Sequence, residues 1–501
     1  MNLAQIAEGH NGDDVAIISR NVSTTYGELS DMVARARGGI LANGIREGDR
    51  VAIIYHNGLG FVVSYLAVLG VGAVAVPLNP TSPAAELERQ LATVEAAAAV
   101  VDRGAAQIWR DVNLARIPSL RIVVAADGAE VPGSISSAEL LAAEPTPIVD
   151  VAPDHLAVLM FTSGTAGSPK AAMLTHGCLQ ANLDQVRGNN DRVTSKDVLY
   201  GVIPLFHAYG VNVILGLSLL TGATLVLVQR FDPATALETI VDRGVTVVPG
   251  APAMWVAFSQ FEEAPRDAFA NIRVALSGAA KLPPAVAERI QSRFGLAIAE
   301  GYGLTEASAV VTSSSGLEPK HGSVGVVLDG IEMRIVDDDG EDALVGDAGE
   351  IWVRGANVFA GYLNDPEATA RVLTDDGWLR TGDIGYCDPD GRVYLVDRAK
   401  DLVIVSGFNV FPAEVEEVLL QHPDVEDVGV IGVPHPHTGE AVKAFVVPKS
   451  GSSLDEESLI DFCLDHLARY KCPSKVLIVD ELPRNAAGKL VRRKLDAVVP
   501  A

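Results

Sequence analysis

Cysteine is scarce in this sequence, with four residues in a chain of 501: Cys178, Cys387, Cys463 and Cys472. No two of them have the CxxC spacing of a zinc or redox motif. A chain of this length can bury a sizeable core without disulfides, so we expect free thiols in a reducing compartment. The N-terminus, MNLAQIAEGHNGDD, has no basic segment followed by an apolar one. It therefore predicts no signal peptide and a cytoplasmic protein.

Basic residues are also few, because 39 Lys and Arg stand against 64 Asp and Glu, which gives a formal net charge of −25. A surface with this balance repels phosphate polymers. The best basic patch, KLVRRK at 489–494, is short and lies near the end of the chain. We therefore expect no nucleic-acid partner, since such binding needs a dense basic patch.

Unbroken apolar runs of membrane length are missing as well. Two uncharged stretches, 51–85 and 208–229, come nearest, but glycines interrupt both of them. A membrane span needs about 20 apolar residues without such breaks. Both stretches are better explained as buried strands and helices. No amphipathic basic helix is evident, so we expect no stable membrane insertion and no more than transient contact with a membrane surface.

Strand and helix signals alternate from residue 24 to about residue 330, as in VLMFTSG, VTVVPGAP and NIRVALSG. This alternation predicts a mostly parallel sheet covered by helices. After residue 330, short strand signals are separated by Asp-Gly turns, which indicates an antiparallel or barrel-like piece. After residue 401 the pattern becomes compact α+β, in about 100 residues, enough for a small domain.

The segment FTSGTAGSPKAAMLTH at 161–176 combines glycines, hydroxyl side chains and one lysine. We interpret it as a loop that follows a strand and precedes a helix, where backbone N–H groups and hydroxyls can hold phosphate. It is not the Walker A motif, because Pro169 precedes the lysine and no Ser or Thr follows it. Taken alone, an ordinary structural loop is an equally good interpretation.

Other motifs of catalysis or metal binding are absent from the sequence. GLGFVV and GYGLTE lack the third glycine of a dinucleotide fingerprint, and neither GxSxG nor HExxH occurs. The acidic run VDDDGEDALVG predicts a hairpin turn, since Ile335 and Gly346 stand where a calcium loop needs acids. His435 and His437, in PHPHTG, indicate a surface turn more than a metal site.

Nine motifs in one order resemble a single family, the adenylate-forming acyl-CoA synthetases, with luciferases and peptide-synthetase adenylation domains as relatives. The resemblance covers nearly the whole chain and is strongest to fatty-acyl-CoA synthetases. The motifs are TSGTAGSPK (162–170), PLFHAYG (204–210), SGAAKL (277–282), GYGLTE (301–306), GEIWVRG (349–355), TGD (381–383), DRAKD (397–401), SGFNVFPAEVEE (406–417) and PRNAAGK (483–489).

The resemblance implies an α/β fold: a large N-terminal domain of βαβ sandwich subdomains plus a distorted β-barrel, and a small mobile α+β C-terminal domain. It places these domains at 1–397 and 402–501, with a hinge at 398–401. It also implies a two-step reaction with ATP, Mg²⁺ and coenzyme A. A carboxylate first displaces pyrophosphate from ATP to form acyl-AMP, and the thiol of coenzyme A then displaces AMP. The protein supplies charge neutralisation and alignment.

For ATP, the resemblance implies a set of contacts drawn from most of the motifs. Within this set, Tyr302 would lie against adenine, Thr305 at the α-phosphate and Asp383 at the ribose. The full set is Thr162, Ser163, Gly164, Thr165, Lys170, Gly278, Ala279, Ala280, Gly301, Tyr302, Gly303, Thr305, Asp383, Arg398 and Lys489. Two departures from the family pattern lie in the phosphate loop, at Ala166 and Ala171.

Several of these residues also have an ordinary structural interpretation. Glu306, which the resemblance makes the Mg²⁺ ligand, also suits a helix N-terminus. Asp383 follows a glycine, as many turn residues do. Arg398 also fits a surface salt bridge. The catalytic set implied by the resemblance is Lys489, Thr305, Glu306 and His207.

The acyl group is expected to bind beside PLFHAYG and VPGAPAMW, at His207, Val211, Gly250 and Trp255. Packing in a core is the ordinary alternative for each of them. The resemblance makes Lys400 the hinge about which the small domain rotates between the two steps. After that rotation, Ser406, Gly407 and Phe408 would line the channel for coenzyme A, with Gly407 leaving room for its slim arm.

The leading hypothesis is a ligase that joins a medium- to long-chain fatty acid to coenzyme A. The expected partner is a small carboxylic acid, and the chain would act as a monomer or homodimer. Alternatives within the fold are a ligase for aryl or other carboxylates, an acyl-AMP ligase that loads a carrier-protein thiol, and a luciferase-like oxygenase. A non-catalytic scaffold is an alternative from another class.

Overall fold

The computed structural model describes residues 1–497 except 127, 163–169, 189–191, 338, 399–402, 406–407, 411, 436–438, 468, 470 and 485–489. At residues 397, 398, 404, 408, 409, 439, 493, 496 and 497 it describes the backbone alone. The chain forms two compact units. The first combines Met1–Glu332 with Val353–Leu379, and the second combines Met333–Trp352 with Arg380–Ala501.

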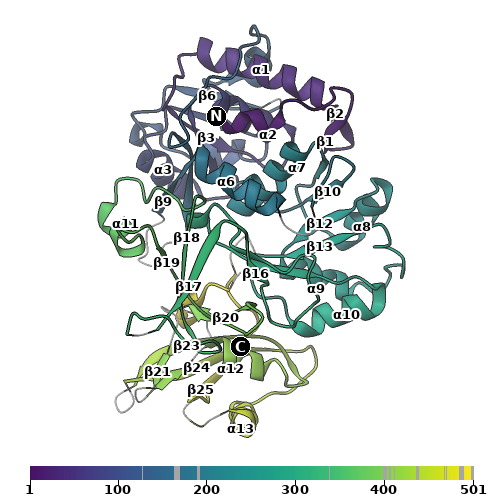
Figure 1. Ribbon diagram of the computed structural model, residues 1–501, viewed down its shortest axis with the longest axis vertical. Helices are drawn as coiled ribbons and strands as arrows, with labels where there is room; N and C mark the ends of the chain where they lie inside the picture. Colours follow the sequence, from purple (N-terminus) through teal and green to yellow (C-terminus); the bar gives the residue numbers. More distant parts are fainter. Residues whose placement is uncertain are drawn as a thin grey trace. The chain divides into compact units, whose positions relative to one another are not determined.

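One sheet of the first unit has the strand order β16-β15-β14-β13-β12-β10-β11-β1-β2 (Figure 1). The neighbours from β14 to β1 pair in parallel, so the carboxyl ends of β10, β12, β13 and β14 lie at one edge. The strands are β1 (Val15–Ser19), β2 (Val22–Thr25), β10 (Val198–Gly201), β11 (Thr224–Leu227), β12 (Val247–Gly250), β13 (Val274–Ser277), β14 (Ala299–Tyr302), β15 (Thr312–Ser313) and β16 (Val326–Val327).

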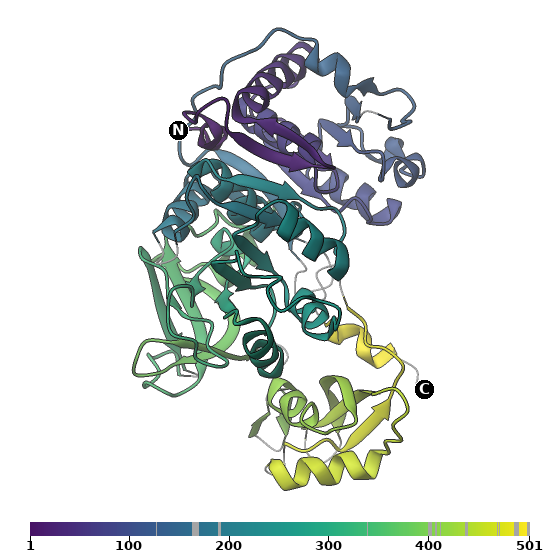
Figure 2. The same cartoon turned by 90° about the vertical axis from the view of Figure 1, so that its right-hand side faces the viewer.

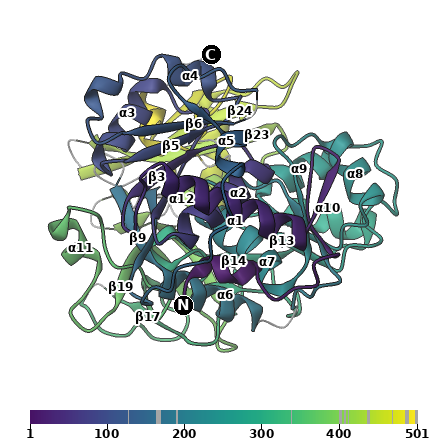
Figure 3. The same ribbon diagram turned by 90° about the horizontal axis from the view of Figure 1, so that it is seen from above.

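The second sheet of this unit has the order β7-β6-β5-β3-β4-β8-β9, parallel except for the hairpin of β8 and β9. Its strands are β3 (Arg50–Ile54), β4 (Val74–Leu78), β5 (Ala98–Val101), β6 (Ile122–Ala125), β7 (Ile135–Ser136), β8 (Leu156–Thr162) and β9 (Lys170–Thr175). Figure 3 shows α3 (Ala84–Thr93) and α4 (Ala106–Arg110) on one side of this sheet, with α1 (Tyr26–Ala42) and α2 (Leu59–Gly70) on the other.

Apolar burial explains these layers. The strands of the second sheet carry Val, Ile and Ala on both faces, and β4 is buried at all five positions. Strands buried on both faces need helices on both faces. The other helical segments of the first unit are η1 (Leu3–Ala7), η2 (Leu114–Arg116), α5 (Ser137–Leu141), α6 (His176–Arg187), η3 (Tyr209–Gly216), α7 (Leu217–Thr221), α8 (Pro233–Asp242), α9 (Pro252–Gln260), α10 (Pro284–Phe294), η4 (Thr305–Ala307) and α11 (Pro366–Val372).

The sequence TTYGE at 24–28 predicts a capping box at Thr24 or Thr25 with Glu28, and α1 begins with one at Thr25. Thr25 accepts a hydrogen bond from the Glu28 N–H, and the Glu28 carboxylate accepts one from the Thr25 N–H. The prediction that 161–176 is a loop leading into a helix is wrong in one respect. Residues 170–175 form the strand β9, and α6 begins only at His176. The antiparallel pairing of β8 with β9 determines this path, since their ends pair Thr162 with Lys170.

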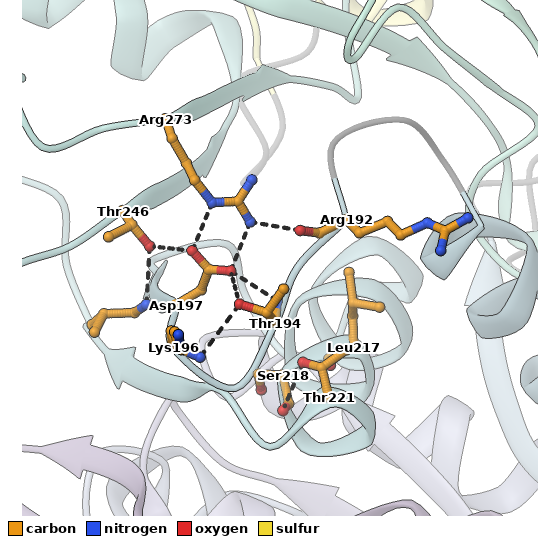
Figure 4. Close-up of polar contacts among 10 residues, drawn as sticks. Arg192, Thr194, Lys196, Asp197, Leu217, Ser218, Thr221, Thr246 and Arg273 are labelled. Carbon is orange, nitrogen blue, oxygen red and sulfur yellow. Dashed lines mark hydrogen bonds and ion pairs between the residues drawn. The ribbon is translucent and has the colours of Figure 1, made fainter.

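The amino ends of β10, β12 and β13 are tied together by one buried carboxylate, Asp197 (Figure 4). Arg273 donates two hydrogen bonds to it, at 2.7 and 2.6 Å. Thr246 donates at 2.8 Å, and the Thr194 N–H and hydroxyl donate at 2.8 and 3.0 Å. These donors hold the pKa of Asp197 at about 2, below its ordinary 3.8, although burial acts in the opposite direction. This cluster anchors the strands at the edge opposite their carboxyl ends.

The second unit contains a sheet of order β22-β21-β24-β23 with β25 beside β24, and helices α12 (Pro412–Leu419) and α13 (Glu456–His466) (Figure 2). Its strands are β21 (Val403–Val405), β22 (Phe408–Val410), β23 (Val425–His435), β24 (Gly439–Pro448) and β25 (Lys475–Ile478), and η6 (Arg492–Ala497) follows. The helices bury Val415, Leu419, Leu459 and Cys463 against the strands. This is the predicted α+β pattern.

A further sheet, of order β17-β18-β19-β20, lies where the sequence predicts an antiparallel or barrel-like piece, and its strands β19 and β20 pair antiparallel. Its strands are β17 (Ile331–Val336), β18 (Gly349–Gly355), β19 (Leu379–Cys387) and β20 (Val393–Arg398). The acidic run after β17 is a turn, as predicted, with the Gly340 N–H donating to the Asp337 carbonyl. The predicted α/β fold with a small α+β part is therefore confirmed. Within the described part of the chain, no helix combines the length and apolarity that a membrane crossing requires.

Candidate active site

The carboxyl ends of four neighbouring strands bring together segments that lie far apart in the sequence. PLFHAYG follows β10, Gly250 ends β12, SGAAKL begins in the last residue of β13, and GYGLTE begins in β14. The Gly278 N–H donates to the Gly250 carbonyl at 3.0 Å, which joins two of these ends. Ligands of open α/β sheets bind at this kind of edge. The predicted contacts at 278–280 and 301–306 therefore share one edge.

The backbone at this edge is strained at one small residue, Ala279, and leaves no room for a side chain at another, Gly303. Ala279 has a φ of +70°, a left-handed conformation that costs a non-glycine residue roughly 1–2 kcal/mol. Strain of this kind is concentrated at functional sites. At Gly303, a Cβ atom would lie 1.6 Å from the Ala309 carbonyl oxygen, so no larger residue fits. This close approach to the Ala309 carbonyl therefore restricts the conformation of the GYGLTE backbone.

The two ends of the predicted phosphate loop are fixed, because Thr162 pairs with Lys170 across the β8–β9 hairpin. The Thr162 hydroxyl is buried and has no hydrogen-bond partner among the described residues, and the same is true of the Ser277 hydroxyl beside Gly278. Buried hydroxyls without partners are rare and suit a polar ligand. Ser163, Gly164 and Thr165, with Ala166, lie outside the described residues.

Lys170 and Glu306, the predicted phosphate and Mg²⁺ contacts, meet at Tyr362. The Lys170 ammonium lies over the Tyr362 ring, 5.0 Å from its centre, and 3.6 Å from the Asp365 carboxylate. The Tyr362 hydroxyl donates to Glu306 Oε1 at 2.8 Å. Burial and the Glu306 charge raise the pKa of Tyr362, so this hydroxyl keeps its proton. Lys170 and Glu306 therefore contact the same aromatic side chain, Lys170 through its ring and Glu306 through its hydroxyl.

The segment 359–363 holds this arrangement by linking the loop of GYGLTE to β9. The Phe359 N–H donates to the Glu306 carbonyl at 2.9 Å. The Ala360 N–H donates to the Met173 carbonyl at 2.9 Å, and the Leu363 N–H donates to the Ala171 carbonyl at 2.8 Å. These backbone hydrogen bonds therefore hold the segment 359–363 against β9, which begins at Lys170, and against the loop that carries Glu306.

Tyr302 and Thr305 lie on the same loop as Glu306. Tyr302 ends β14 and is 8% exposed. Thr305 begins η4, and its carbonyl accepts a hydrogen bond from the Ser308 N–H at 3.0 Å. Their contacts with adenine and the α-phosphate remain predictions.

His207 lies in the loop between β10 and η3, with its ring 5.2 Å from that of Phe206. Burial lowers its pKa, which favours the neutral imidazole. The following segment, η3, is a π-helix, a form often found at functional sites. This placement is compatible with the predicted role beside the carboxylate, which remains a prediction.

Asn57 holds the segment that leads to His207. Its side-chain oxygen accepts from the Leu205 N–H at 2.9 Å, and its amide lies 3.2 and 3.0 Å from the Gly201 and Ile203 carbonyls. The side chain is buried, with an exposed fraction of 6%. It follows β3 of the second sheet, so it joins the two sheets of the first unit.

Asn57→Ala is expected to lower the free energy of unfolding by about 1–3 kcal/mol, because it leaves the buried Leu205 N–H without a partner. Urea unfolding of the purified variant measures this as a lower midpoint with an unchanged slope. Asn43→Ala is the control, since Asn43 donates to Gly39 within its own helix end. A loss no larger than that of the control would contradict a clamping role for Asn57.

The remaining acyl-pocket predictions fall on buried positions. Val211 lies in η3 and is 2% exposed, and Gly250 is buried at the end of β12. Trp255 is fully buried in an aromatic core cluster with Phe258 and Phe269, and its indole N–H donates to the Leu276 carbonyl at 3.1 Å. Trp255 therefore has the surroundings of a core residue, and contact with an acyl group at these positions remains a prediction.

Asp383 and Arg398 belong to the second unit, where β19 and β20 pair them directly across the antiparallel ladder. The two residues predicted to contact the ribose therefore lie directly opposite each other on neighbouring strands. Phe408 begins β22. Lys400, Ser406, Gly407 and Lys489 lie outside the described residues, so their roles remain predictions.

The donor set suits Mg²⁺ held jointly with a nucleotide. Among the residues that the structure describes, no group of three or more His, Cys, Asp or Glu side chains could hold a metal ion by itself. Mg²⁺ is commonly bound through one or two carboxylates together with substrate phosphates. The Glu306 carboxylate is a ligand of this kind, and Lys170, which contacts the ring of the same Tyr362, is a cation of the kind that phosphate needs.

Sequence reasoning missed Asn57, Tyr362 and Asp365. Asn57 stands in HNG, and Asp365 stands in NDPEA, and both sequences are typical of turns. The available signal was the pattern Asp365-Pro366 at a helix start, because Asp365 caps α11. Nothing in the local sequence points from Tyr362 to Glu306.

Comparison with known proteins agrees with this geometry. Residues 3–363 match the family model of AMP-binding enzymes, and residues 414–489 match that of the AMP-binding enzyme C-terminal domain. The chain is 34% identical over 491 residues to 4-coumarate–CoA ligase 3 of Oryza sativa subsp. japonica, which covers 96% of this chain and 88% of the relative. It is 34% identical over 512 residues to the long-chain-fatty-acid–CoA ligase of Bacillus subtilis (strain 168), with 96% and 91% covered.

The fold is similar to the crystal structure of ATP-bound MatB from Rhodopseudomonas palustris, with a TM-score of 0.90. That match is 32% identical and covers 99% of this chain and 98% of the other. The chain therefore belongs to the adenylate-forming AMP-binding enzymes, among the AMP-forming acid–thiol ligases, which use ATP, Mg²⁺ and coenzyme A.

Proposed function

We propose that this chain converts a medium- to long-chain fatty acid to its acyl-adenylate and then transfers the acyl group to coenzyme A. One observation supports the proposal above the others. Lys170 and Glu306, a cation and a hard oxygen ligand, converge on Tyr362 beside the carboxyl ends of the strands. Both are suited to the charge of a nucleotide's phosphate tail.

In the first step, a carboxylate oxygen of the acid attacks the α-phosphorus of ATP, and pyrophosphate leaves with the electron pair of the broken P–O bond. Lys170 and the Thr162 hydroxyl would bind the departing phosphates. Thr305 and Lys489 would stabilise the charge at the α-phosphate. Glu306 would hold Mg²⁺, which offsets phosphate charge when bound. The neutral His207 would stand beside the acid.

In the second step, the thiol sulfur of coenzyme A attacks the acyl carbonyl and gives up its proton to solvent, and AMP leaves with the electron pair of the C–O bond. Asp383 and Arg398 would hold the ribose of the nucleotide. Ser406, Gly407 and Phe408 would line the approach of the thiol after the small domain rotates about Lys400. The same site would thus release pyrophosphate in the first step and AMP in the second.

An aryl acid is the second candidate substrate. It is favoured by the relative that joins 4-coumarate to coenzyme A, which is as similar to this chain as the fatty-acid ligase. Transfer to a carrier-protein thiol is an alternative for the second step.

The test is a panel of octanoate, hexadecanoate, 4-coumarate and ferulate, each with Mg-ATP, followed by pyrophosphate release with and without coenzyme A. Release with the fatty acids, and an acyl-CoA product when coenzyme A is present, would support the proposal. Pyrophosphate release with the aryl acids alone would show that the substrate is an aryl acid and not a fatty acid. An adenylate that coenzyme A cannot discharge would favour the carrier-protein ligase, and no release with any acid would favour a scaffold.

Lys400→Pro is expected to suppress thioester formation while leaving adenylate formation close to wild type, because proline fixes the φ angle about which the hinge would turn. Pre-formed acyl-AMP with coenzyme A isolates the second step, and pyrophosphate release isolates the first. Lys400→Ala is the control, since it keeps a rotatable backbone and should spare both steps. Equal losses of both steps in the proline variant would contradict the hinge.

A further inference from the structure

The Tyr362 side chain contacts both charged groups of the proposed ATP site. Its hydroxyl donates to Glu306 Oε1 at 2.8 Å, and its ring carries the Lys170 ammonium at 5.0 Å. Backbone pairing already holds β9, which begins at Lys170, and β14, which ends four residues before Glu306, so neither contact is needed to form these strands.

We propose that Tyr362 is a positioning residue that orients Glu306 for Mg²⁺ and Lys170 for phosphate. This inference rests on the proposed function. A hydrogen bond to one oxygen of a carboxylate restricts its rotation and leaves the other oxygen, here Oε2, for the metal. The ring face attracts the ammonium through the cation–π interaction and limits the positions that its flexible stem can reach.

The Tyr362 side chain is itself held firmly enough to orient others. Its backbone N–H donates to the Thr369 hydroxyl at 2.9 Å, and its backbone pairs with Ala172 of β9. Its ring meets the Phe359 ring edge to face, with centroids 5.0 Å apart. The phenol therefore has one position relative to β9 and to the loop that carries Glu306.

Asp365 completes the arrangement by dividing its two oxygens between two tasks. Oδ1 accepts from the Ala368 N–H at 2.9 Å and so caps α11, whereas Oδ2 lies 3.6 Å from the Lys170 ammonium. The cap holds the Asp365 carboxylate in place, and this carboxylate limits the position of the Lys170 ammonium together with the Tyr362 ring. The short segment 362–365 thus positions both charges.

The closing experiment measures ATP binding without any acid, so that no chemistry occurs. Calorimetric titrations at a series of Mg²⁺ concentrations give the half-saturating Mg²⁺ for ATP binding. Tyr362→Phe removes the hydroxyl and keeps the ring. It is expected to raise the half-saturating Mg²⁺ by about 10- to 100-fold, as for other partners of metal-ligating groups. ATP affinity at saturating Mg²⁺ should stay near wild type.

Tyr362→Leu also removes the ring, and it is expected to weaken ATP binding at saturating Mg²⁺ by about 3- to 30-fold. Tyr394→Phe is the matched control, because the Tyr394 hydroxyl donates to the Asp388 carboxylate at 3.1 Å in the second unit. It should leave both quantities unchanged. Thermal unfolding of each variant identifies effects that come from lost stability.

The outcomes separate this inference from the function on which it rests. If wild-type ATP binding does not depend on Mg²⁺, or if Glu306→Gln keeps that dependence, the proposed metal site fails. If wild type and Glu306→Gln behave as proposed and Tyr362→Phe matches wild type, the positioning role of Tyr362 is overturned.

Discussion

Lys489→Ala is expected to slow acyl-adenylate formation by about 10²- to 10³-fold, while the conversion of supplied acyl-AMP to the thioester stays close to wild type. The ammonium would neutralise charge that develops on the α-phosphate and carboxylate oxygens as the new P–O bond forms. Removing one such contact costs on the order of 3–4 kcal/mol of transition-state stabilisation. The second step forms no P–O bond, so it should not need this cation.

The two half-reactions can be measured separately with the same preparations. Pyrophosphate release in single-turnover mixtures reports the first step, and thioester formation from acyl-AMP reports the second. Lys449→Ala is the control, because Lys449 is an exposed lysine of the same unit that donates to the Pro423 carbonyl. Equal losses of both steps in Lys489→Ala would refute the assignment of Lys489 to adenylation.

Local signals in the sequence were sufficient for most of the fold. The capping box at Thr25 and Glu28, the apolar strands and the Asp-Gly turns all act over a few residues. The sequence of the strand β19 does not predict a strand, because Thr381, Gly382 and Asp383 form a turn-like sequence at its centre. Pairing with β20, including a shift of register after Ile384, overrides that preference.

The sequence predicted individual residues of the candidate site but not the contacts between them. The motif order gave Lys170 and Glu306, each with a chemistry that suits phosphate or Mg²⁺. Their common partner, Tyr362, is 56 residues from Glu306 in sequence, and only the tertiary structure brings the two together. Asn57 was hidden for the same reason, because its partners follow β10 of the other sheet.

Asp197→Ala is expected to lower the free energy of unfolding by about 2–3 kcal/mol, the cost of leaving buried hydrogen-bond donors without their acceptor, since the Arg273 side chain is 38% exposed and water solvates its charge. The Asp197 side chain is 5% exposed, and its loss leaves Arg273, Thr246 and Thr194 without their shared acceptor. Urea unfolding measures the change. Asp31→Ala is the matched control, since Asp31 pairs with Arg35 on an exposed helix face and should contribute less than about 1 kcal/mol.

The same carboxylate predicts how this stability depends on pH. The folded pKa of Asp197 is about 2, below its ordinary 3.8, so the folded state binds the proton less readily than the unfolded state. Its contribution is therefore complete above pH 3.8 and is lost as the pH falls through 2. The difference in unfolding free energy between wild type and Asp197→Ala should be constant from pH 7 to about pH 5 and shrink below pH 4. A difference that stays constant down to pH 2 would show that the charge of Asp197 does not stabilise the strand ends, because a neutral side chain would then serve as well.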